Sequence, residues 1–471
     1  MKKLFAYALC LTAIIISSCN KNQVKKPVLS ASPIISFKLD KDQVGDAIID
    51  NSSDSAKIIV NVTANTGTLS YTPDIILEPG ASISPASNVK ITIDINGTYV
   101  YTVTTSLGTA EKYYLIIKNN LPSQVVYKDN AVTNFFRRQT GHIASDGGFT
   151  IPLSNGKVLW LMGDSHINDF RASDSTMNWL FQVRNAGLLQ PTNDWTWQHT
   201  STLVGSDSSV PSYIKFSPDN THWVWPGAGF QQGDSVYMYS SNLTTVGSGT
   251  FGFGSGGNDF MAVARMSDMR VMGYYQLQNF NGINFGITFI DNHDGYMYVY
   301  GNKSAFIASD IYLARFPLNN IRSKWTFWDG GGFNTDVTKA KSVGQGQSNG
   351  VSINRVNGKF IIASTEFSVG CNQGNRIFIS TSDSPVGPFS VARPVYKITD
   401  TVQNDYPFFY AAIIHPEYTN SKMEMLLTYA INGYPNCLPD HDANNRSIPD
   451  RYRLRGIRIP WNVISTNYSI K

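Results

Sequence analysis

The sequence has 471 residues, of which 42% are hydrophobic and only 15% are charged. Aromatic residues make up 12% of the chain, and glycine is frequent, with 38 residues. This composition excludes a disordered chain, which would be rich in charge and poor in aromatic residues, and it excludes a coiled coil. Many aromatic residues, many glycines and few charges instead favour short β-strands joined by tight turns. The formal charge of +4 is too small and too dispersed to indicate a nucleic-acid partner.

The first residues of the chain have the pattern of an export signal rather than of a folded element. A basic start is followed by an apolar run, residues 4–16, that is too short to span a bilayer as a stable helix. The run ends in Ser17-Ser18-Cys19, which resembles the cleavage site of a bacterial lipoprotein signal. We therefore expect residues 1–18 to be a lipoprotein signal peptide and Cys19 to carry the lipid. The alternative is an ordinary secretory signal with a chance cysteine.

Export also determines the expected location and the state of the cysteines. Residues 19–30 are expected to form a polar tether, and no later segment is apolar enough to span a membrane, so the lipid would be the only anchor. The protein is then expected in the bacterial cell envelope, at the outer membrane, and either side of that membrane is compatible with the sequence. Cys371 and Cys437 remain after the signal is removed, and in an oxidising compartment they either form a disulfide or stay as two free thiols.

A small β domain is expected over residues 31–120. In KITIDI (90–95) every second residue is apolar, as in a strand with one buried face. Asn96-Gly97 separates this run from TYVYTVTT (98–105), and this dipeptide is a strong hairpin signal. About six such strands predict an immunoglobulin-like β-sandwich. The stretch also resembles the sandwich modules that follow the lipid-bearing cysteine of many Bacteroidetes surface lipoproteins, where the module is usually a spacer.

The rest of the chain, residues 121–471, repeats a unit of strand, tight turn and strand. The spacings between successive turns are 77, 62, 63 and 63 residues. A repeat of this kind is typical of a propeller, and five units with four strands each predict a five-bladed β-propeller. A large sandwich with chance periodicity is the alternative. The turn residues are Gly156, Gly233, Gly295, Gly358 and Ser421.

Outer strands complete the expected blades. WTWQHT (195–200), WTFWDG (325–330) and FSVARPVY (389–396) have the aromatic and β-branched residues of such strands. The way in which the ring closes is less evident, and QVVYK (124–128) is a candidate for an outer strand of the last blade.

Four stretches of this repeat region resemble one superfamily of five-bladed propellers, that of glycoside hydrolase families 43 and 117 and the fructosidases. The resemblance covers residues 121–471 and is nearest to a branch of Bacteroidetes propellers whose reactions are uncharacterised. It implies the fold strongly and the reaction weakly, because one fold hosts many functions. The stretches are DGGFTIPLSNGKVLWLMGDS (146–165), YLARFPLNNIRSKWTFWDG (312–330), STSDSPVGPFS (380–390) and FYAAIIHP (409–416).

The repeat alignment sorts the polar residues onto one face of the ring. The starts of the inner strands and the ends of the second strands share this face, where ligands bind in the resembled superfamily. Acids, imidazoles, aromatic rings and amides gather there, a mixture that suits sugars. The expected substrate-binding residues are Trp223, Trp225, Asn284, Asn349 and Tyr410.

Glycoside hydrolysis needs two carboxyl groups flanking the scissile bond. In the resembled families an Asp at the start of the first blade is the base or nucleophile, and Asp146 has the matching position. The acid there is a Glu on a later blade, for which Glu366 is the candidate. Asp164 is expected to orient a sugar or to tune the pKa of a neighbour, and His166 is a candidate substitute acid.

Departures from the resembled pattern keep structural alternatives open. The Asn-Asp-Pro and Arg-Asp-Pro motifs of those families are absent, and the second blade opens with tryptophans rather than with an Asp. Asp146 is otherwise a turn residue before two glycines, and Asp164 is otherwise a hydrogen-bond acceptor for backbone. Glu366 and His166 are otherwise solvated rim residues, and the two tryptophans are otherwise packing residues of the blade.

Two further features have a site interpretation and a structural one. In the loop at 436–452, Asp440, His441 and Asp442 are candidates for a structural cation, although they match no metal fingerprint, and a polar lid is the alternative. Arg137 and Arg138 are candidates for binding an acidic sugar or a sulfate, or else they form a solvated pair.

Two functions are compatible with these observations. The first is a glycosidase at the cell envelope that acts on a polysaccharide or oligosaccharide by acid-base chemistry, with no cofactor. The second is a non-catalytic carbohydrate-binding lipoprotein that keeps the propeller without a complete acid pair. The missing acid of the second blade is the feature that separates the two functions, because it weakens the evidence for an enzyme; the glycosidase remains the first prediction and carbohydrate binding the alternative.

Overall fold

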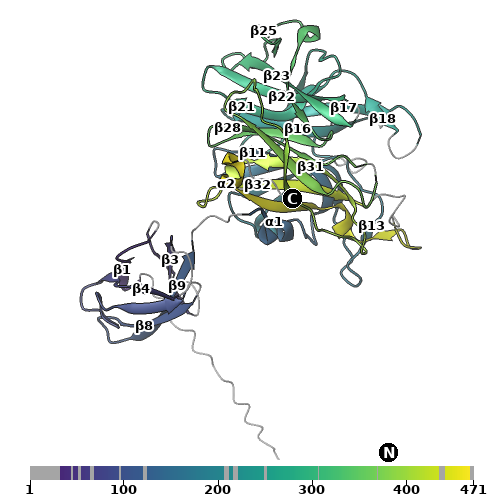
Figure 1. Cartoon of the computed structure of the whole chain (residues 1–471). Helices are drawn as coiled ribbons and strands as arrows, with labels where there is room; N and C mark the ends of the chain where they lie inside the picture. The colour runs from purple at the N-terminus through teal and green to yellow at the C-terminus, as the bar shows by residue number, and fades with distance from the viewer. Residues whose placement is uncertain are drawn as a thin grey trace, which may run out of the picture. The chain divides into compact units, whose positions relative to one another are not determined.

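The structure is a computed structural model (Figure 1), and it describes residues 32–43, 46–50, 55–63, 68–94, 97–119, 125–205, 212–215, 221–248, 252–305, 307–368, 370–433 and 441–466. The expected signal peptide, Cys19, the tether and Cys437 lie outside these residues. The chain divides into two compact units, residues 1–121 and 122–471. None of the helices in the described ranges combines the length and the apolarity that crossing a membrane requires.

The first unit is a β domain of nine described strands around one hydrophobic core. Alternate side chains of β3 are buried, so the sheet has one apolar face. The core joins residues of the large sheet to residues of two strand pairs, as in a sandwich. The immunoglobulin-like topology stays a prediction, and β3 and β9 run parallel. The large sheet has the order β2(Ile48–Asp50), β3(Ala56–Val62), β9(Ala110–Asn119), β8(Thr98–Thr104), β6(Ser82–Ser84); the pairs are β1(Ile34–Lys38) with β5(Asp74–Leu77) and β4(Thr68–Tyr71) with β7(Ile91–Asp94).

The second unit is the five-bladed β-propeller that the repeat predicted. Each blade is an antiparallel sheet whose first strand lies innermost, and neighbouring inner strands contact one another around a closed ring. The first blade consists of β11(His142–Pro152), β12(Lys157–Ile167), β14(Ala186–Pro191) and β15(Ser201–Leu203), and the second of β16(His222–Gln232), β17(Ser235–Thr245), β19(Phe260–Arg265) and β20(Val271–Gln276). The third blade consists of β21(Asn284–Asp291), β22(Tyr296–Ala305), β23(Ala308–Pro317), β24(Thr326–Trp328) and β25(Phe333–Asn334), and the fourth of β27(Val351–Val356), β28(Lys359–Thr365), β29(Arg376–Ser382) and β30(Arg393–Lys397). The fifth blade consists of β31(Phe408–His415), β32(Glu424–Asn432), β34(Leu454–Pro460) and β10(Tyr127–Lys128).

Short strands and helical turns lie outside the main strands of the blades. Two strands pair with the ends of β17 and β23, two others pair across the first and fifth blades, and helical turns connect strands. They are β18(Phe253–Ser255), β26(Ser342–Gly346), β13(Met177–Asn178) with β33(Arg446–Ser447), the helices α1(Asn130–Phe135) and α2(Trp461–Ser465), and the 3-10 turns Trp197–His199, Val337–Lys339, Pro416–Tyr418 and Pro449–Tyr452.

The repeated turns have the backbone that the sequence predicted. Four of the five turn residues are glycines with a left-handed backbone, and a side chain is disfavoured there. Their φ angles are 75° at Gly156, 57° at Gly233, 88° at Gly295 and 82° at Gly358. The periodicity is therefore a property of the hairpin between the first two strands of a blade, and the chance-periodicity alternative is wrong.

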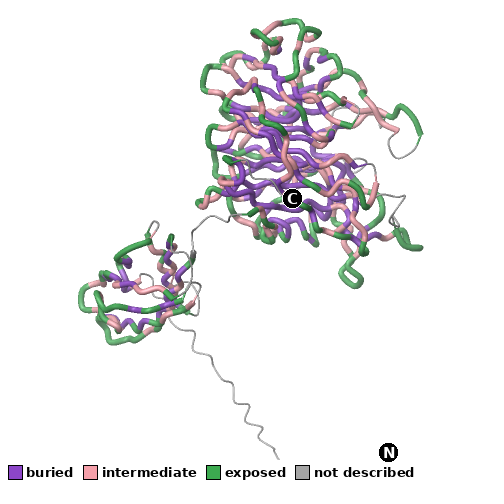
Figure 2. The backbone as a smooth tube through the Cα atoms, in the orientation of Figure 1, coloured by how far each residue is buried: buried purple, intermediate pink, exposed green. Residues whose placement is uncertain are grey.

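One hydrophobic cluster fills each of the five gaps between neighbouring blades. Both faces of every sheet are therefore apolar. Figure 2 shows that buried residues predominate along the blade strands of the second unit. The largest buried side chain, Trp160, packs between the first and fifth blades and donates a hydrogen bond from Nε1 to Gln190 Oε1 at 2.6 Å. A cavity of about 150 Å³ on the ring axis touches all five inner strands, through residues that include Thr150, Gly229, Thr288, Asn354 and Ile413.

The ring closes through a strand from before the first blade. Tyr127 and Lys128 pair with β34 of the last blade, so the strand predicted over residues 124–128 is confirmed for these two residues, while residues 125 and 126 are not in a strand. One outer-strand prediction is wrong: residues 195–200 contain a 3-10 turn, and the outer strand of the first blade is β15. In the other two predicted outer strands, β24 and β30 occupy part of the expected ranges.

We expect the closing segment to be anchored by Asp129. Its carboxylate accepts hydrogen bonds from the backbone of Ala131 and Val132 and lies 2.7 Å from Nε of Arg458, a side chain only 7% exposed. Asp129→Ala removes a helix cap and leaves a buried guanidinium without its carboxylate, so it should lower the free energy of unfolding by about 3 kcal/mol. Chemical denaturation measures this loss. Asp174→Ala, which breaks an exposed pair with Arg171, should have a much smaller effect, and equal losses would contradict the assignment.

Candidate active site

Breaks in strand register position the candidate residues at one level of the ring. The pairing of the inner strand with its neighbour shifts near the start of β11, β16, β21 and β31. A bulge bends its strand and redirects nearby side chains, and bulges are frequent beside active sites. Four predicted site residues, Asp146, Trp225, Asn284 and Tyr410, lie at or just before these four shifts. The repeat therefore places them at equivalent positions of four blades.

Asp146 lies in the bulge of the first inner strand and is held by tyrosines. The hydroxyl of Tyr410 donates to Asp146 Oδ2 at 2.8 Å, and Tyr452 forms a second hydrogen bond to this carboxyl. Burial is the largest influence and raises the pKa of Asp146, while the two hydrogen bonds oppose that rise. Asp146 is therefore a partly buried carboxyl held by two tyrosines of the fifth blade, rather than only a turn residue before two glycines.

A glycine of the neighbouring strand makes room for this carboxyl. A Cβ atom at Gly163 would lie 2.1 Å from Oδ1 of Asp146, so any side chain there would displace it. Gly147 follows Asp146 with a φ of 81°, a conformation that other residues rarely adopt. Both glycines are visible in the sequence, but only the structure shows that Gly163 is required by a carboxylate on another strand.

Asp164 is the second carboxyl of the site and is only 7% exposed. Nε1 of Trp225 donates to its Oδ1 at 3.2 Å, and Nη1 of Arg184 lies 3.7 Å from the same oxygen. Burial, followed by the charge of Asp146, raises the pKa of Asp164 from 3.8 to about 7, against the opposing effect of Arg184. Near neutral pH the pair can therefore hold one proton on Asp164, the arrangement by which one carboxyl serves as acid and another as base.

Arg184 is a site residue that the sequence analysis missed. Its guanidinium carbon lies 4.3 Å from the ring centroid of Trp223 and 4.9 Å from that of Phe181. Trp223 therefore stacks on an arginine, while Trp225 has an edge contact with Phe253, with 4.7 Å between the rings. Both tryptophans thus support the groups around Asp164. Their expected role as a sugar platform stays a prediction.

His166 is buried rather than solvated. It is 2% exposed, and its Nδ1 lies 3.1 Å from Oδ2 of Asp169, which also accepts a hydrogen bond from Gln182 at 2.7 Å. The ring of His166 lies 6.1 Å from that of Tyr452, which in turn bonds to Asp146. His166 therefore adjoins the carboxyl pair through Tyr452, and Asp169 orients its imidazole.

Glu366 has a different environment. Both of its oxygens accept from the guanidinium of Arg376, and the backbone N–H groups of Asn375 and Arg376 add two more hydrogen bonds. The hydrogen bond from Arg376 is the largest influence and lowers the pKa of Glu366, whereas a general acid needs a raised pKa. Within the described part of the chain, no hydrogen bond or ion pair links Glu366 to Asp146 or Asp164.

The remaining predicted binding residues form hydrogen bonds within the propeller. Asn284 and Asn349 are both exposed. Oδ1 of Asn284 accepts from the backbone of Gly286 at 3.0 Å, and Asn349 bonds to Ser309 at 2.8 Å. These bonds hold strand ends, so the two amides stabilise the rim of the ring. Tyr410 differs, since its hydroxyl reaches Asp146 directly.

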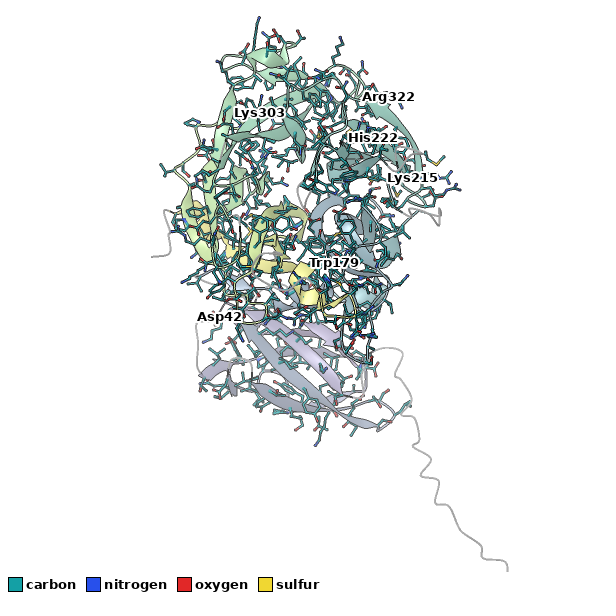
Figure 3. All side chains as sticks on the ribbon, turned by 90° about the vertical axis from the view of Figure 1, so that its right-hand side faces the viewer. Asp42, Trp179, Lys215, His222, Lys303 and Arg322 are labelled. Atoms are coloured by element: carbon teal, nitrogen blue, oxygen red, sulfur yellow. The ribbon has the colours of Figure 1, made fainter. Side chains whose placement is uncertain are left out.

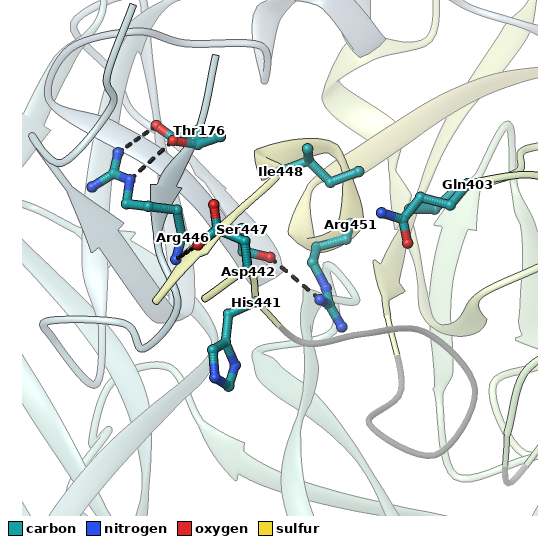
Figure 4. A pocket seen from close by; sticks show the side chains of 9 residues that line it. Thr176, Gln403, His441, Asp442, Arg446, Ser447, Ile448 and Arg451 are labelled. Carbon is teal, nitrogen blue, oxygen red and sulfur yellow. Dashed lines mark hydrogen bonds between the residues drawn. The ribbon is translucent and has the colours of Figure 1, made fainter. Parts of the chain in front are cut away.

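Loops of the first and fifth blades, with the segment that joins the fourth blade to the fifth, line a pocket of about 190 Å³ (Figure 4). Arg446 and Arg451 line it together with His441 and Asp442, and Oδ1 of Asp442 accepts from the backbone of Arg446 at 2.9 Å. Two guanidinium groups oppose the binding of a cation, and no cluster of metal-ligating side chains occurs among the described residues, which exclude Asp440. Trp179, labelled in Figure 3, is exposed. Its ring packs on that of His441, with 4.5 Å between the ring centroids.

Cys371 is in a disulfide. Its predicted partner Cys437 lies outside the described residues, so the pairing stays a prediction.

Comparisons with known proteins identify relatives of the propeller. The family model described as a domain of unknown function, DUF5005, matches residues 129–462. No curated protein sequence matches the chain. Among solved structures, a presumed hydrolase of Bacteroides ovatus is 18% identical with a TM-score of 0.59, and the match covers 74% of this chain and 93% of that protein. At this identity the match shows a shared fold alone.

Two glycoside hydrolases match less well. The catalytic domain of a GH62 α-L-arabinofuranosidase of Coprinopsis cinerea is 11% identical with a TM-score of 0.40, covering 72% of this chain and 94% of that domain. An exo-β-1,3-galactanase of Phanerochaete chrysosporium, solved with β-1,3-galactotriose, is 11% identical with a TM-score of 0.38, covering 70% of this chain and 63% of that protein. Scores this low carry no argument.

The raised pKa of Asp164 predicts how stability changes with pH. Because folding raises this pKa from 3.8 to about 7, the folded state holds the proton more tightly, and its stability falls as the pH rises through that range. Asp164→Asn cannot ionise, so it should exceed the wild type in unfolding free energy above pH 7 by up to about 4 kcal/mol. The difference should vanish near pH 4.

Urea denaturation between pH 4 and 8 measures this difference. Glu366→Gln is the matched control, and its change in unfolding free energy should have the opposite sign. The pKa of Glu366 is lowered in the wild type, so the ionised carboxylate stabilises the wild type at neutral pH and the variant should be less stable. A wild-type advantage over Asp164→Asn at pH 8 would show that Asp164 is an ordinary ionised carboxylate.

Proposed function

The chain belongs to the family of the domain of unknown function DUF5005, and we propose that its propeller is a glycoside hydrolase that cleaves a polysaccharide or oligosaccharide. The coupled carboxyl pair of Asp146 and Asp164 is the observation that carries the proposal. One carboxyl accepts hydrogen bonds from two tyrosines, and the pKa of the other is about 7, which are the conditions for paired base and acid. The fold shared with a presumed hydrolase agrees with this role without establishing it.

The proposed mechanism assigns one carboxyl to each side of the scissile bond. Asp164 donates its proton to the leaving oxygen while the glycosidic bond breaks. Asp146 either removes a proton from the attacking water or bonds to the anomeric carbon, to be released by water in a second step. Tyr410 and Tyr452 position Asp146, and Trp225 and Arg184 position Asp164.

The environment of Glu366 motivates a change from the expected roles. As an acid, Glu366 would have to hold a proton, yet Arg376 stabilises its ionised form. Asp164 has the raised pKa that the acid requires. We therefore assign the acid to Asp164 and a structural role to Glu366.

A carbohydrate-binding protein without turnover is the second candidate. The observation that favours it is the ion pair of Glu366 with Arg376. Glu366 has the position that the acid has in the resembled families, and this ion pair leaves that position without a free acid. In this case Asp146 and Asp164 would accept hydrogen bonds from sugar hydroxyls.

We further propose that the protein is lipid-anchored through Cys19 in the bacterial cell envelope, at the outer membrane. The support is the short apolar run that ends in Ser17-Ser18-Cys19. Cys19→Ala should move the protein from the membrane fraction to the soluble fraction, and continued membrane partitioning would exclude the lipid anchor.

The catalytic proposal is tested in two steps. A panel of polysaccharides is first scored for both binding and new reducing ends. On the substrate so found, Asp146→Asn and Asp164→Asn should each lower kcat by about 100- to 10,000-fold, because the amide keeps the shape of the carboxyl but cannot transfer a proton. Glu366→Gln should retain kcat within several-fold. Circular dichroism confirms that each variant is folded.

The nature of the leaving group separates the two candidate acids. An aryl glycoside of the same sugar has an aryl oxide as its leaving group, which departs without being protonated. The variant that lacks the acid should therefore recover most of its rate on that substrate. We expect recovery for Asp164→Asn and none for Asp146→Asn. Recovery by Glu366→Gln instead would return the acid role to Glu366, and saccharide binding without turnover would favour the second candidate function.

A further inference from the structure

Arg138 is a buried cation without a carboxylate. It lies between α1 and β11 and is 2% exposed. Burial alone lowers its pKa to about 10, and no acid raises that pKa. Its neighbour Arg137 is the contrast, because that side chain is half exposed and forms an ion pair with Asp450 at 3.0 Å. A solvated pair of arginines was one interpretation of the sequence. In the structure the two adjacent arginines have opposite environments instead.

Most of the donors of Arg138 have no acceptor. Nη2 donates to the backbone oxygen of Thr200 at 3.0 Å, whereas Nε and Nη1 have no hydrogen-bond partner among the described residues. The guanidinium also lies 5.5 Å from the ring of Trp197. Buried donors without acceptors destabilise a protein, and a buried charge without a counter-charge does so more strongly. Other buried arginines avoid this cost, as Arg453 does with Asp450 at 2.9 Å.

A cavity of about 350 Å³ adjoins this guanidinium. Arg138, Trp197 and Thr200 line it with Gln198 and Asn168. Thr200 is 6% exposed, and its hydroxyl also has no partner. The cavity therefore combines an uncompensated positive charge, a hydroxyl and an aromatic ring. Within the described chain, none of these five side chains bonds to Asp146 or Asp164, so the cavity is separate from the carboxyl pair.

We propose that this cavity is a second binding site, which takes the oxyanion of an acidic saccharide, a carboxylate or a sulfate group. Arg138 supplies the charge. Its Nε and Nη1 and the Thr200 hydroxyl are closed to solvent in the unbound chain, so binding includes a side-chain rotation that turns these donors toward the oxyanion, while Trp197 packs against the carrier sugar. The oxyanion follows from the cavity itself, whereas the saccharide as its carrier rests on the proposed function.

Isothermal titration of the full chain with three probes at constant ionic strength tests the site. The probes are sodium glucuronate, a sulfated monosaccharide and inorganic sulfate, with glucose as the neutral control. We expect saturable binding of at least one acidic sugar and none of glucose. Thr200→Val should weaken that binding several-fold, and Arg138→Met should abolish it. Because binding is measured without turnover, a failure of the hydrolase proposal would leave this result unchanged.

Two controls make the outcome decisive. Arg137→Met removes a neighbouring charge of the same sign and should leave the affinity unchanged. Arg138→Met removes an uncompensated buried charge, so its melting temperature without ligand should equal or exceed that of the wild type. Binding of inorganic sulfate alone would overturn the saccharide assignment. Equal binding by wild type and by the folded Arg138 and Thr200 variants, or no binding of any anion, would overturn the site.

Discussion

The constraint on which the propeller depends is that every blade is apolar on both faces. A sheet of this kind cannot leave either face in water, so each blade needs a neighbour on both sides, and the ring must close. Five hydrophobic clusters, one for each gap between blades, satisfy this requirement. Closure uses a strand from before the first blade, Tyr127–Lys128, and the ion pair of Asp129 with Arg458 beside it.

Closure of the ring also creates the site. Inner strands that meet around an axis bring residues of equivalent blade positions together, and the bulges of four inner strands interrupt regular pairing at that level. Asp146 thereby contacts Tyr410, 264 positions away in the sequence, and the missing side chain of Gly163 gives the carboxyl its space. Burial and mutual repulsion then raise the pKa of Asp164, as in paired carboxyls that divide acid and base roles.

The periodic part of this architecture was predictable from the sequence, and the partner of each polar group was not. The turn glycines and alternating apolar residues recur at fixed spacing, and they predicted the blades and the grouping of Asp146 with Tyr410, whereas the closing strand lies outside the repeat and was only a candidate. The contacts of Arg184 with Asp164 and of Tyr452 with Asp146 do not recur from blade to blade, so the repeat could not predict them. The same holds for Arg376, which lowers the pKa of Glu366. The predicted outer strand at 195–200 failed because aromatic residues favour a strand and pack equally well on a 3-10 turn, as Trp197 does there.

The central claim is that Asp146 and Asp164 form one coupled acid-base pair. Its most direct test is the pH titration of the aspartate carboxyl carbons by nuclear magnetic resonance, with Asp164→Asn to assign the resonance. We predict that Asp164 titrates near pH 7 in the wild type, and that its pKa falls in Asp146→Asn because the neighbouring negative charge is removed. An Asp164 pKa near 4 in the wild type, or a pKa unchanged by Asp146→Asn, would contradict the account.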